Sequence, residues 1–515
     1  MSPIGAPGPL WRTIRATAAN HSGRPAVTFL DAQLEAETLS FGELVERVEA
    51  LAARLALVAS PGPVGLLLRR QEDQVLHYLA ALAAGLTPSI LTPPSPRIDL
   101  GWYLRTARAA IHTAGFAAIV TDVPELVDEA TTTVLTPWGL EPLADVPGAH
   151  PIDTGGAAFL QFSSGTTGAK KGVLIPDDRV LAQLGTYGEA IGLSPDDVIV
   201  SWLPLYHDMG FVACLNMPLA AGSHLVLLEP LEWVARPATY LAAVERFRGS
   251  LSWHPNFAYA LMAQRCSADS LDLSSLRGLV NCSEPATHRS QQAFLDRFEP
   301  ARLRPDVFWG CYAMAETTFA LTHGVTRPDG PAPSVGRALP GVEIDVVGGD
   351  GRVCDDGEVG ELRVRAPFLA DGYVGKHPAG SESFTADGYL TGDLGYRRGE
   401  LVFVCGRAKD VLIVAGVNVM PHDVEELAGS VPGVKAGRVA AFAVFDDARQ
   451  TERIVVLCEP EADELEPLTL AEARRRIVSS LGVANVEVRG VAPGTIVKSS
   501  SGKVARAENA RRFAA

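Results

Sequence analysis

Two kinds of segment alternate along the first 300 residues, and this alternation constrains the fold more than any other feature. Apolar residues recur at helical spacing in 41–57 and 71–84, whereas 64–68 and 116–121 are short continuous apolar runs. Continuous runs are typical of strands that are buried on both faces of a parallel sheet. Strands that alternate with helices predict an α/β fold with layered sheets.

The pattern changes after about residue 336. Short strand-like segments at 342–347, 361–364 and 401–405 are separated by Gly and Asp, which predicts a small β-rich subdomain. From 409 onward, strand-like and helical segments form a compact α+β unit of about a hundred residues. We therefore expect a large N-terminal domain over 1–408 and a small C-terminal domain over 409–515.

Composition excludes several classes of protein. Of the 515 residues, 47% are hydrophobic and 20% are charged, which is a globular balance rather than that of a disordered chain. The 45 Lys and Arg residues against 60 Asp and Glu residues give a net charge of −15, so nucleic acid is not an expected partner.

Targeting and cysteine signals predict a cytoplasmic protein. Residues 1–15 lack the apolar core of a signal peptide, and no uninterrupted apolar run is long enough for a transmembrane helix. The seven cysteines are scattered and never form Cys-x-x-Cys, which indicates reduced thiols rather than a zinc site or a disulfide framework.

A loop rich in Gly, Ser and Thr is the strongest local motif. Residues 163–168 separate an apolar run at 157–162 from Lys170, Lys171 and a second apolar run. Small residues let backbone N–H groups approach an anion, while hydroxyls and lysine add hydrogen bonds and charge, so the loop suits a polyphosphate. It does not match the P-loop, whose lysine opens a helix. A flexible hairpin without a ligand has the same composition, so the loop alone leaves both interpretations open.

The later motifs are weak when each is taken alone. His207-Asp208 occurs more often as a structural pair than as a catalytic one, and Tyr312 and Glu316 could be a core and a solvated residue. By itself, Asp393 would be an aspartate in a turn. The segments 406–410 and 498–503 would each pass as loops.

Their joint order carries more information. The Gly/Ser/Thr/Lys loop, Tyr-His-Asp, Ser-Glu-Pro, Tyr with Ala-Glu, Thr-Gly-Asp, Gly-Arg-x-Lys-Asp and a terminal Ser-Gly-Lys follow one another between 160 and 503. This series resembles the acyl-adenylate-forming superfamily of acyl-CoA synthetases, peptide-synthetase adenylation domains and luciferases. Segments 203–210, 255–259 and 416–425 are most similar to the fatty acyl-AMP ligase branch.

The chain also departs from that branch. Fatty acyl-AMP ligases typically carry an insertion after the Ala-Glu motif that is thought to hinder the CoA step, but only seventeen residues separate Glu316 from Ser334. Ala313 stands where Gly is usual, Lys170 where Pro is usual and Val417 where Arg is usual. The short connection favours CoA as the acyl acceptor.

The resemblance implies ATP, Mg²⁺ and CoA, or the phosphopantetheine of a carrier protein, as cofactors. It assigns catalytic roles to Lys503, Glu316, His207 and Lys171, with Glu316 also holding the metal, and it places a hinge at Lys409 for a mobile C-terminal domain. The implied nucleotide-binding residues are Ser163, Ser164, Gly165, Thr166, Thr167, Gly168, Ser283, Glu284, Pro285, Tyr312, Thr317, Asp393 and Arg407.

The implied acyl pocket is apolar, so a hydrophobic carboxylic acid is the expected substrate. Its expected lining is Met209, Phe211, His254, Cys282, Cys311, Ala313 and Met314. We expect an AMP-forming acyl-CoA synthetase of lipid, polyketide or other specialised metabolism. Two alternatives stay open: an acyl-AMP ligase that loads an acyl carrier protein, and a non-catalytic binding protein on the same scaffold.

Overall fold

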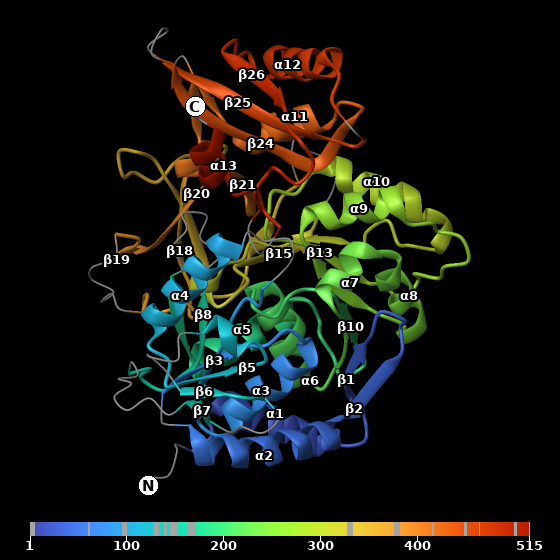
Figure 1. Ribbon diagram of the computed structural model, residues 1–515, viewed down its shortest axis with the longest axis vertical. Coiled ribbons are helices and arrows are strands. Elements are labelled where there is room, and N and C mark those ends of the chain that lie inside the picture. Colours follow the sequence, from blue (N-terminus) through green and yellow to red (C-terminus); the bar gives the residue numbers. More distant parts are fainter. Residues whose placement is uncertain are drawn as a thin grey trace.

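The computed structural model gives the architecture of most of the chain. It describes residues 6–59, 62–94, 100–127, 133–137, 142–144, 153–162, 171–326, 333–374, 382–414, 417–446, 451–462, 464–498 and 502–513. In Figure 1 a large lower body holds the N-terminal elements, and a smaller body at the top holds the last hundred residues.

A parallel block forms the centre of the largest sheet. Its strands run in the order β1-β11-β10-β12-β13-β14, and β2 pairs antiparallel with β1 at the edge. Both faces are covered, so nearly all residues of these strands are buried and most are apolar. Their bounds are β1 Pro25–Leu30, β2 Ala36–Ser40, β10 Val198–Ser201, β11 His224–Leu228, β12 Leu251–His254, β13 Gly278–Asn281 and β14 Phe308–Gly310.

The β-rich segment continues this same sheet. β15 pairs antiparallel with β14, and the order runs on as β16-β21-β20-β18-β17, with β19 paired to β20. Asp393 lies inside β20 rather than in a turn, so that interpretation of its motif is wrong. Gly392 before it has φ +73°, which lets the strand bulge there. The bounds are β15 Thr322–Val325, β16 Gly336–Ala338, β17 Glu343–Val347, β18 Gly360–Arg365, β19 Phe384–Thr385, β20 Gly388–Arg398 and β21 Leu401–Arg407.

A second sheet lies beside the first and has the order β4-β3-β5-β6-β7. The predicted helices are present as α2 (Phe41–Val58) and α3 (Gln71–Ala83). α2 begins with a capping box between Ser40 and Glu43, while α3 is buried on all sides from Gln71 to Leu82. The bounds are β3 Pro63–Leu67, β4 Thr87–Ile90, β5 Ala118–Thr121, β6 Thr133–Leu135 and β7 Pro142–Ala144.

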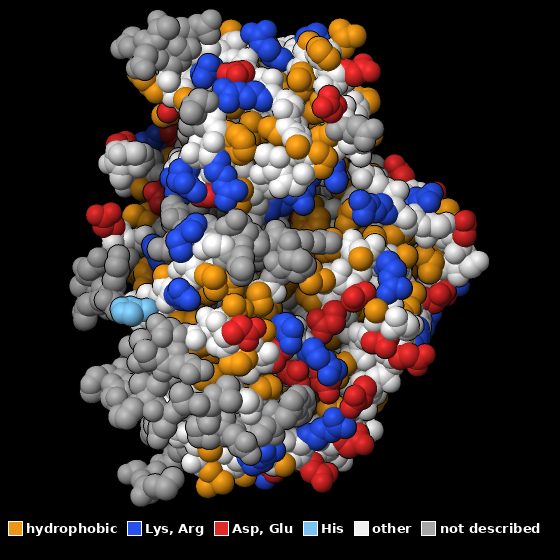
Figure 2. Space-filling view, viewed as in Figure 1, with side chains coloured by type: hydrophobic (Ala, Val, Ile, Leu, Met, Phe, Trp, Pro, Cys, Tyr) orange, Lys and Arg blue, Asp and Glu red, His pale blue; other side chains and the backbone are white. Residues whose placement is uncertain are grey.

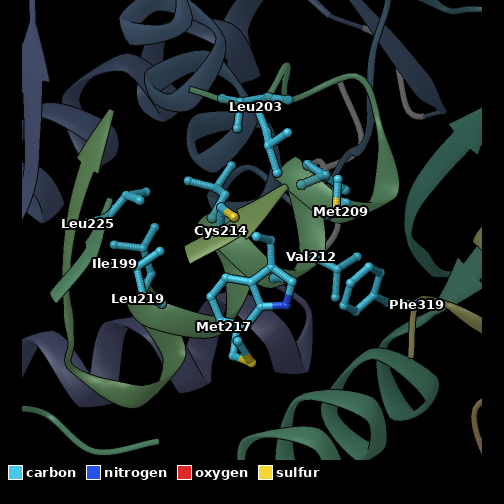
Figure 3. Packing of buried hydrophobic residues seen from close by; sticks show 14 of the residues in the cluster. Ile199, Leu203, Met209, Val212, Cys214, Met217, Leu219, Leu225 and Phe319 are labelled. Carbon is cyan, nitrogen blue, oxygen red and sulfur yellow. The ribbon is translucent and has the colours of Figure 1, made fainter. Parts of the chain in front are cut away.

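Helices cover both sheets, and their apolar faces build one large core. Figure 3 shows Ile199 of β10 and Leu225 of β11 near Cys214 of η2, a π-helical segment at Met209–Asn216, while Val212 of the same segment lies beside Phe319. No helix in the described ranges is long and apolar enough to cross a membrane. The other helices are α1 Pro9–Asn20, α4 Leu100–Ala114, α5 Asp177–Ala190, α6 Met217–Ala221, α7 Pro230–Ala235, α8 Ala238–Phe247, α9 Asn256–Arg265 and α10 His288–Phe298.

The C-terminal segment has apolar clusters of its own. Val424, Val456 and Ile477 belong to a cluster between the sheet β24-β25-β26 and helices α11 and α12, and α13 covers the other face. The bounds are β22 Leu412–Val414, β23 Val417–Val419, α11 Pro421–Gly429, β24 Val434–Asp446, β25 Thr451–Pro460, α12 Pro467–Leu481, β26 Val486–Gly490 and α13 Arg506–Phe513. We call residues 412–513 the C-terminal unit.

Buried histidines make this fold sensitive to acid. Trp202 Nε1 donates to His254 Nδ1 at 2.8 Å, and Ser252 Oγ, which itself donates to Val200, lies 3.0 Å from Nε2. His254 therefore carries its single proton on Nε2, and burial lowers its pKa to about 3. Burial also lowers the pKa of His224 and His323 to about 4.

We expect the unfolding free energy to fall as the pH drops from 6.5 towards 4. In that window the unfolded chain protonates these histidines while the folded chain does not. Urea midpoints, followed by tryptophan fluorescence across this range, test the expectation. His254→Gln is expected to give a shallower pH dependence than the parent chain, and an equal slope would contradict the assignment.

Candidate active site

A cleft of about 1780 Å³ lies between the C-terminal unit and the rest of the chain. Its floor is formed where β12, β13 and β14 end, since Pro255, Ser283 and Cys311 follow those strands and line it. The carboxyl ends of parallel strands are where open α/β sheets bind ligands. The strands are in register, with His254 beside Asn281 and Asn281 beside Gly310, so the loops that follow them reach the cleft together.

Asp393 is held from two directions. The Tyr312 hydroxyl donates to Asp393 Oδ2 at 2.7 Å, and Arg407 Nε lies 2.9 Å from Oδ1. β20 and β21 set the second contact because Asp393 and Arg407 are paired across them. Burial and the Asp393 charge raise the pKa of Tyr312 well above its usual range, so the phenol stays a donor. The carboxylate is thereby presented to the cleft in one orientation.

Glu316 is held by a chain of two tyrosines. Tyr373 donates to Glu316 Oε1 at 2.8 Å, and Tyr389 lies 3.0 Å from the Tyr373 hydroxyl. A phenol has one proton, so Tyr389 must be the donor of the second bond. Lys171 Nζ lies 4.5 Å above the Tyr373 ring. Neither tyrosine was predicted as a site residue: Tyr389 opens the segment that contains Asp393, whereas Tyr373 belongs to no motif.

The arrangement around Glu316 suits a magnesium ion that is shared with phosphates. Mg²⁺ is bound by one or two carboxylates together with substrate phosphates rather than by a full protein cage. Glu316 lines the cleft with one oxygen held by Tyr373. The described residues contain no group of three or more His, Cys, Asp or Glu side chains that could hold a metal without such help.

Lys503 comes from the C-terminal unit and shares the cleft with Asp208 and Glu284. Burial raises the pKa of both carboxyls, and the Lys503 charge opposes that rise. Asp208 ends the Tyr-His-Asp motif but was not predicted as a site residue, although its place beside His207 could have suggested such a role. His207 lines the same wall, with its ring 4.7 Å from that of Tyr206.

The Ser-Glu-Pro motif forms another part of the lining. Ser283 has φ +73°, a strained value for a residue with a side chain, and Glu284 follows it into the cleft. Thr317 is fully buried, and its hydroxyl lies 3.0 Å from the backbone oxygen of Phe319 and 3.2 Å from that of Met314, so it supports the Ala315–Thr317 turn instead of facing the cleft. Lys409 lies in the short helix Ala408–Asp410 at the junction, where burial and then Arg407 lower its pKa.

An apolar lobe of the cleft lies beside helices α7 and α9. The rings of Trp202 and Trp233 stack at 3.6 Å, and the Phe257 ring meets both at 6.2 Å. Four of the predicted pocket residues, Met209, Cys311, Ala313 and Met314, line the cleft. The residues that line the apolar lobe are Trp202, Leu203, Pro230, Leu231, Val234, Phe257, Ala260 and Leu261.

Three predicted pocket residues do not line this cleft. Phe211 is buried against Tyr78 and Phe159, each 4.7 Å away, and both ring nitrogens of His254 are used inside the core. Cys282 is also buried. The predicted phosphate loop lies outside the described residues; its flanks pair as the hairpin β8 (Ala157–Phe162) and β9 (Gly172–Pro176). The residues of that loop are Ser163, Ser164, Gly165, Thr166, Thr167 and Gly168.

Positive charge is concentrated at the cleft. Among the described residues that line it, twelve are Lys or Arg and eight are Asp or Glu, whereas acidic residues predominate in the chain as a whole. Figure 2 shows Lys and Arg side chains gathered along the junction below the C-terminal unit. Such a cleft favours anionic ligands despite the net charge of −15.

Comparison with known proteins gives consistent similarities. The model of the AMP-binding enzyme family matches residues 14–374. The chain is 28% identical to JamA of Moorena producens, a medium-chain-fatty-acid–[acyl-carrier-protein] ligase, over 94% of this chain and 91% of JamA. It is 29% identical to FadD26 of Mycobacterium marinum, a long-chain-fatty-acid–AMP ligase, over 97% of this chain and 96% of FadD26. A solved fatty acyl-adenylate ligase structure, from work on the E. coli and L. pneumophila enzymes, has a TM-score of 0.85 at 27% identity and covers 100% of this chain and 99% of its own.

The tyrosine chain generates a prediction about stability. Tyr373→Phe leaves a buried Glu316 oxygen without its donor, so we expect a loss of about 1–3 kcal/mol in the unfolding free energy. Tyr389→Phe removes only the bond between two phenols and is expected to cost about 1 kcal/mol. Urea unfolding of both variants measures the difference, and an equal or reversed order would contradict the proposed direction of donation.

Proposed function

The chain belongs to the AMP-binding enzyme family, and we propose that it activates a fatty acid with ATP and transfers the acyl group to a thiol. The carboxylate oxygen attacks the α-phosphorus, forming an acyl–O–P bond and releasing pyrophosphate. A thiol then attacks the acyl carbon, forming a thioester and releasing AMP. The observation that carries this proposal is that Asp393, Glu316 and Lys503 converge on one cleft from three parts of the chain.

We assign nucleotide binding to the fixed carboxylate and its surroundings. Asp393, oriented by Tyr312 and Arg407, accepts hydrogen bonds from the ribose hydroxyls, while Ser283, Glu284, Pro285 and the Tyr312 ring lie around adenine. This assignment is supported by the rigid contacts at Asp393. Glu316 would hold Mg²⁺, which when bound neutralises phosphate charge, and Lys171 adds a cation on the same side.

Lys503 is the proposed adenylation catalyst. The first step brings two anions together, so a compact ammonium between the acid carboxylate and the α-phosphate lowers the barrier. Its place in the same cleft as Asp208 and Glu284 supports this role, because its charge opposes the rise in the pKa of both carboxyls that burial causes, and two acidic side chains favour a cation there. His207 is proposed as a gate between this position and the acyl lobe.

The C-terminal unit is proposed to be a mobile domain that begins at Lys409. Its separate apolar clusters support a boundary between 1–408 and 409–515. Rotation about Lys409 would withdraw Lys503 after adenylation and admit the thiol, a common form of gating by domain motion.

CoA is the proposed acceptor, and a carrier-protein phosphopantetheine is the second candidate. The alignment with FadD26 spans 577 positions, whereas this chain has 515 residues, so the relative carries segments that this chain lacks. With the short connection after Glu316, this favours the CoA step. A carrier protein stays the second candidate acceptor because JamA, a similar protein, is an acyl-carrier-protein ligase.

The function is tested by pyrophosphate–ATP exchange with a panel of fatty acids, followed by addition of CoA and identification of the product by mass. We expect exchange and release of acyl-CoA. Lys503→Ala should reduce exchange by at least about 100-fold, yet still convert prepared acyl-AMP and thiol to thioester.

Each outcome separates one alternative. Acyl-AMP without acyl-CoA, combined with transfer to a phosphopantetheinylated carrier protein, would assign the second acceptor. No exchange with any acid would indicate a binding protein instead. Equal loss of both half-reactions in Lys503→Ala would contradict the rotating domain.

The apolar lobe generates a prediction about chain length. Ala260→Phe places a ring between α7 and α9, so we expect kcat/KM to fall about tenfold or more for acids of twelve carbons while short acids change little. Ala242→Phe, on α8 outside the cleft lining, adds the same side chain as a control. A uniform loss across chain lengths would argue against this lobe as the acyl site.

A further inference from the structure

Glu284 is fixed to the N-terminal part of the molecule. Its Oε1 accepts a hydrogen bond from the backbone N–H of Phe257 at 2.6 Å. The Phe257 ring in turn meets the edges of Trp202 and Trp233 in the core. The left-handed backbone at Ser283, with φ +73°, directs the following carboxyl into the cleft. Glu284 therefore cannot follow the C-terminal unit if that unit moves.

The cations that face Glu284 come from the other side of the junction. Lys503, Lys498 and Arg506 line the cleft together with Glu284, and their charges lower the pKa of its carboxyl against the rise that burial causes. All three belong to the last segment of the C-terminal unit, where a backbone bridge between Lys498 and Val504 closes the loop that carries Lys503. One acidic group of the N-terminal domain is thus opposed by three cations of the unit that is proposed to move.

Arg506 connects this cluster to the hinge. Its guanidinium lies 2.7 Å from Glu425 of α11 and 3.3 Å from Asp410, the residue after Lys409. Because Arg506 is anchored inside the C-terminal unit, attraction to Glu284 acts on the unit as a body and not on one flexible side chain. The loop also passes close to the Phe257 ring, since a Cβ added at Gly502 would lie 3.8 Å from it.

We propose that Glu284 is a positioning residue for adenylation. Its carboxylate, fixed by Phe257, holds the C-terminal unit in the arrangement that puts Lys503 in the cleft. This role rests on the proposed function. It differs from lining the adenine site, for which the shape of the Glu284 side chain would matter but its charge would not. When the unit rotates, Glu284 loses its three cations, so its charge favours the arrangement for the first half-reaction over that for the second.

Glu284→Gln tests the charge while keeping the acceptor for the Phe257 N–H. We expect kcat for acid-dependent pyrophosphate exchange to fall about tenfold, with KM for ATP within about twofold, and conversion of prepared acyl-AMP by thiol to be unchanged or faster. Lys498→Met should also lower pyrophosphate exchange relative to the conversion of acyl-AMP. The variant with both substitutions should lose no more exchange than the poorer single variant, because both substitutions remove the same interaction.

Glu229→Gln is the matched control. Glu229 is also a buried carboxyl that accepts a backbone N–H, from Gln71 at 2.9 Å, but the cation that acts on it is Arg70 of its own domain. This variant should leave both half-reactions unchanged. A raised KM for ATP with unchanged kcat in Glu284→Gln, equal loss of both half-reactions, or no effect would overturn the inference. If the parent chain shows no exchange, the proposed function fails first, and the inference fails with it.

Discussion

The carboxylate of Asp393 joins the paired strands β20 and β21 to the end of the parallel block, about eighty residues earlier in the sequence. Tyr312 reaches it from the end of the parallel block, and Arg407 reaches it from the strand that leads to the C-terminal unit. A buried carboxylate is costly unless it is hydrogen-bonded and paired, so these contacts must form together. They set the position of β20 against β14 and the exit direction of the chain at Lys409. The shape of the cleft therefore depends on the hydrogen bond and the ion pair of the Asp393 carboxylate.

The charges of the cleft explain how an acidic protein can serve an anionic substrate. Charges interact more strongly in a water-poor cleft than on an exposed surface. Their interaction decays over about 10 Å at moderate salt. A local excess of Lys and Arg therefore outweighs a distant surplus of Asp and Glu. Asp208 and Glu284, which line the cleft with Lys503, balance part of this excess.

Apolar patterns predicted the helices at 41–57 and 71–84 and the strands at 64–68, 116–121, 342–347, 361–364 and 401–405 to within two residues. The motif around Asp393, taken alone, wrongly indicated a turn, because Gly and Asp in a bulged strand resemble a turn locally. The pocket lining that the family resemblance implied included Phe211, His254 and Cys282, which do not line the cleft. Strands buried on both faces have no polar side to mark orientation, and η2 follows neither the 3.6-residue nor the 2-residue period.

The sequence by itself determined the α/β class, the change of architecture near residue 336 and the family, since spacing and motif order are local or collinear properties. Tertiary structure alone decided which carboxylates face which cations. Tyr373 and Tyr389 reach Glu316, and Lys498 and Arg506 face Glu284, across separations of tens to hundreds of residues. Pairing at such range follows from the register of the sheet and the seating of the C-terminal unit, which no local pattern encodes.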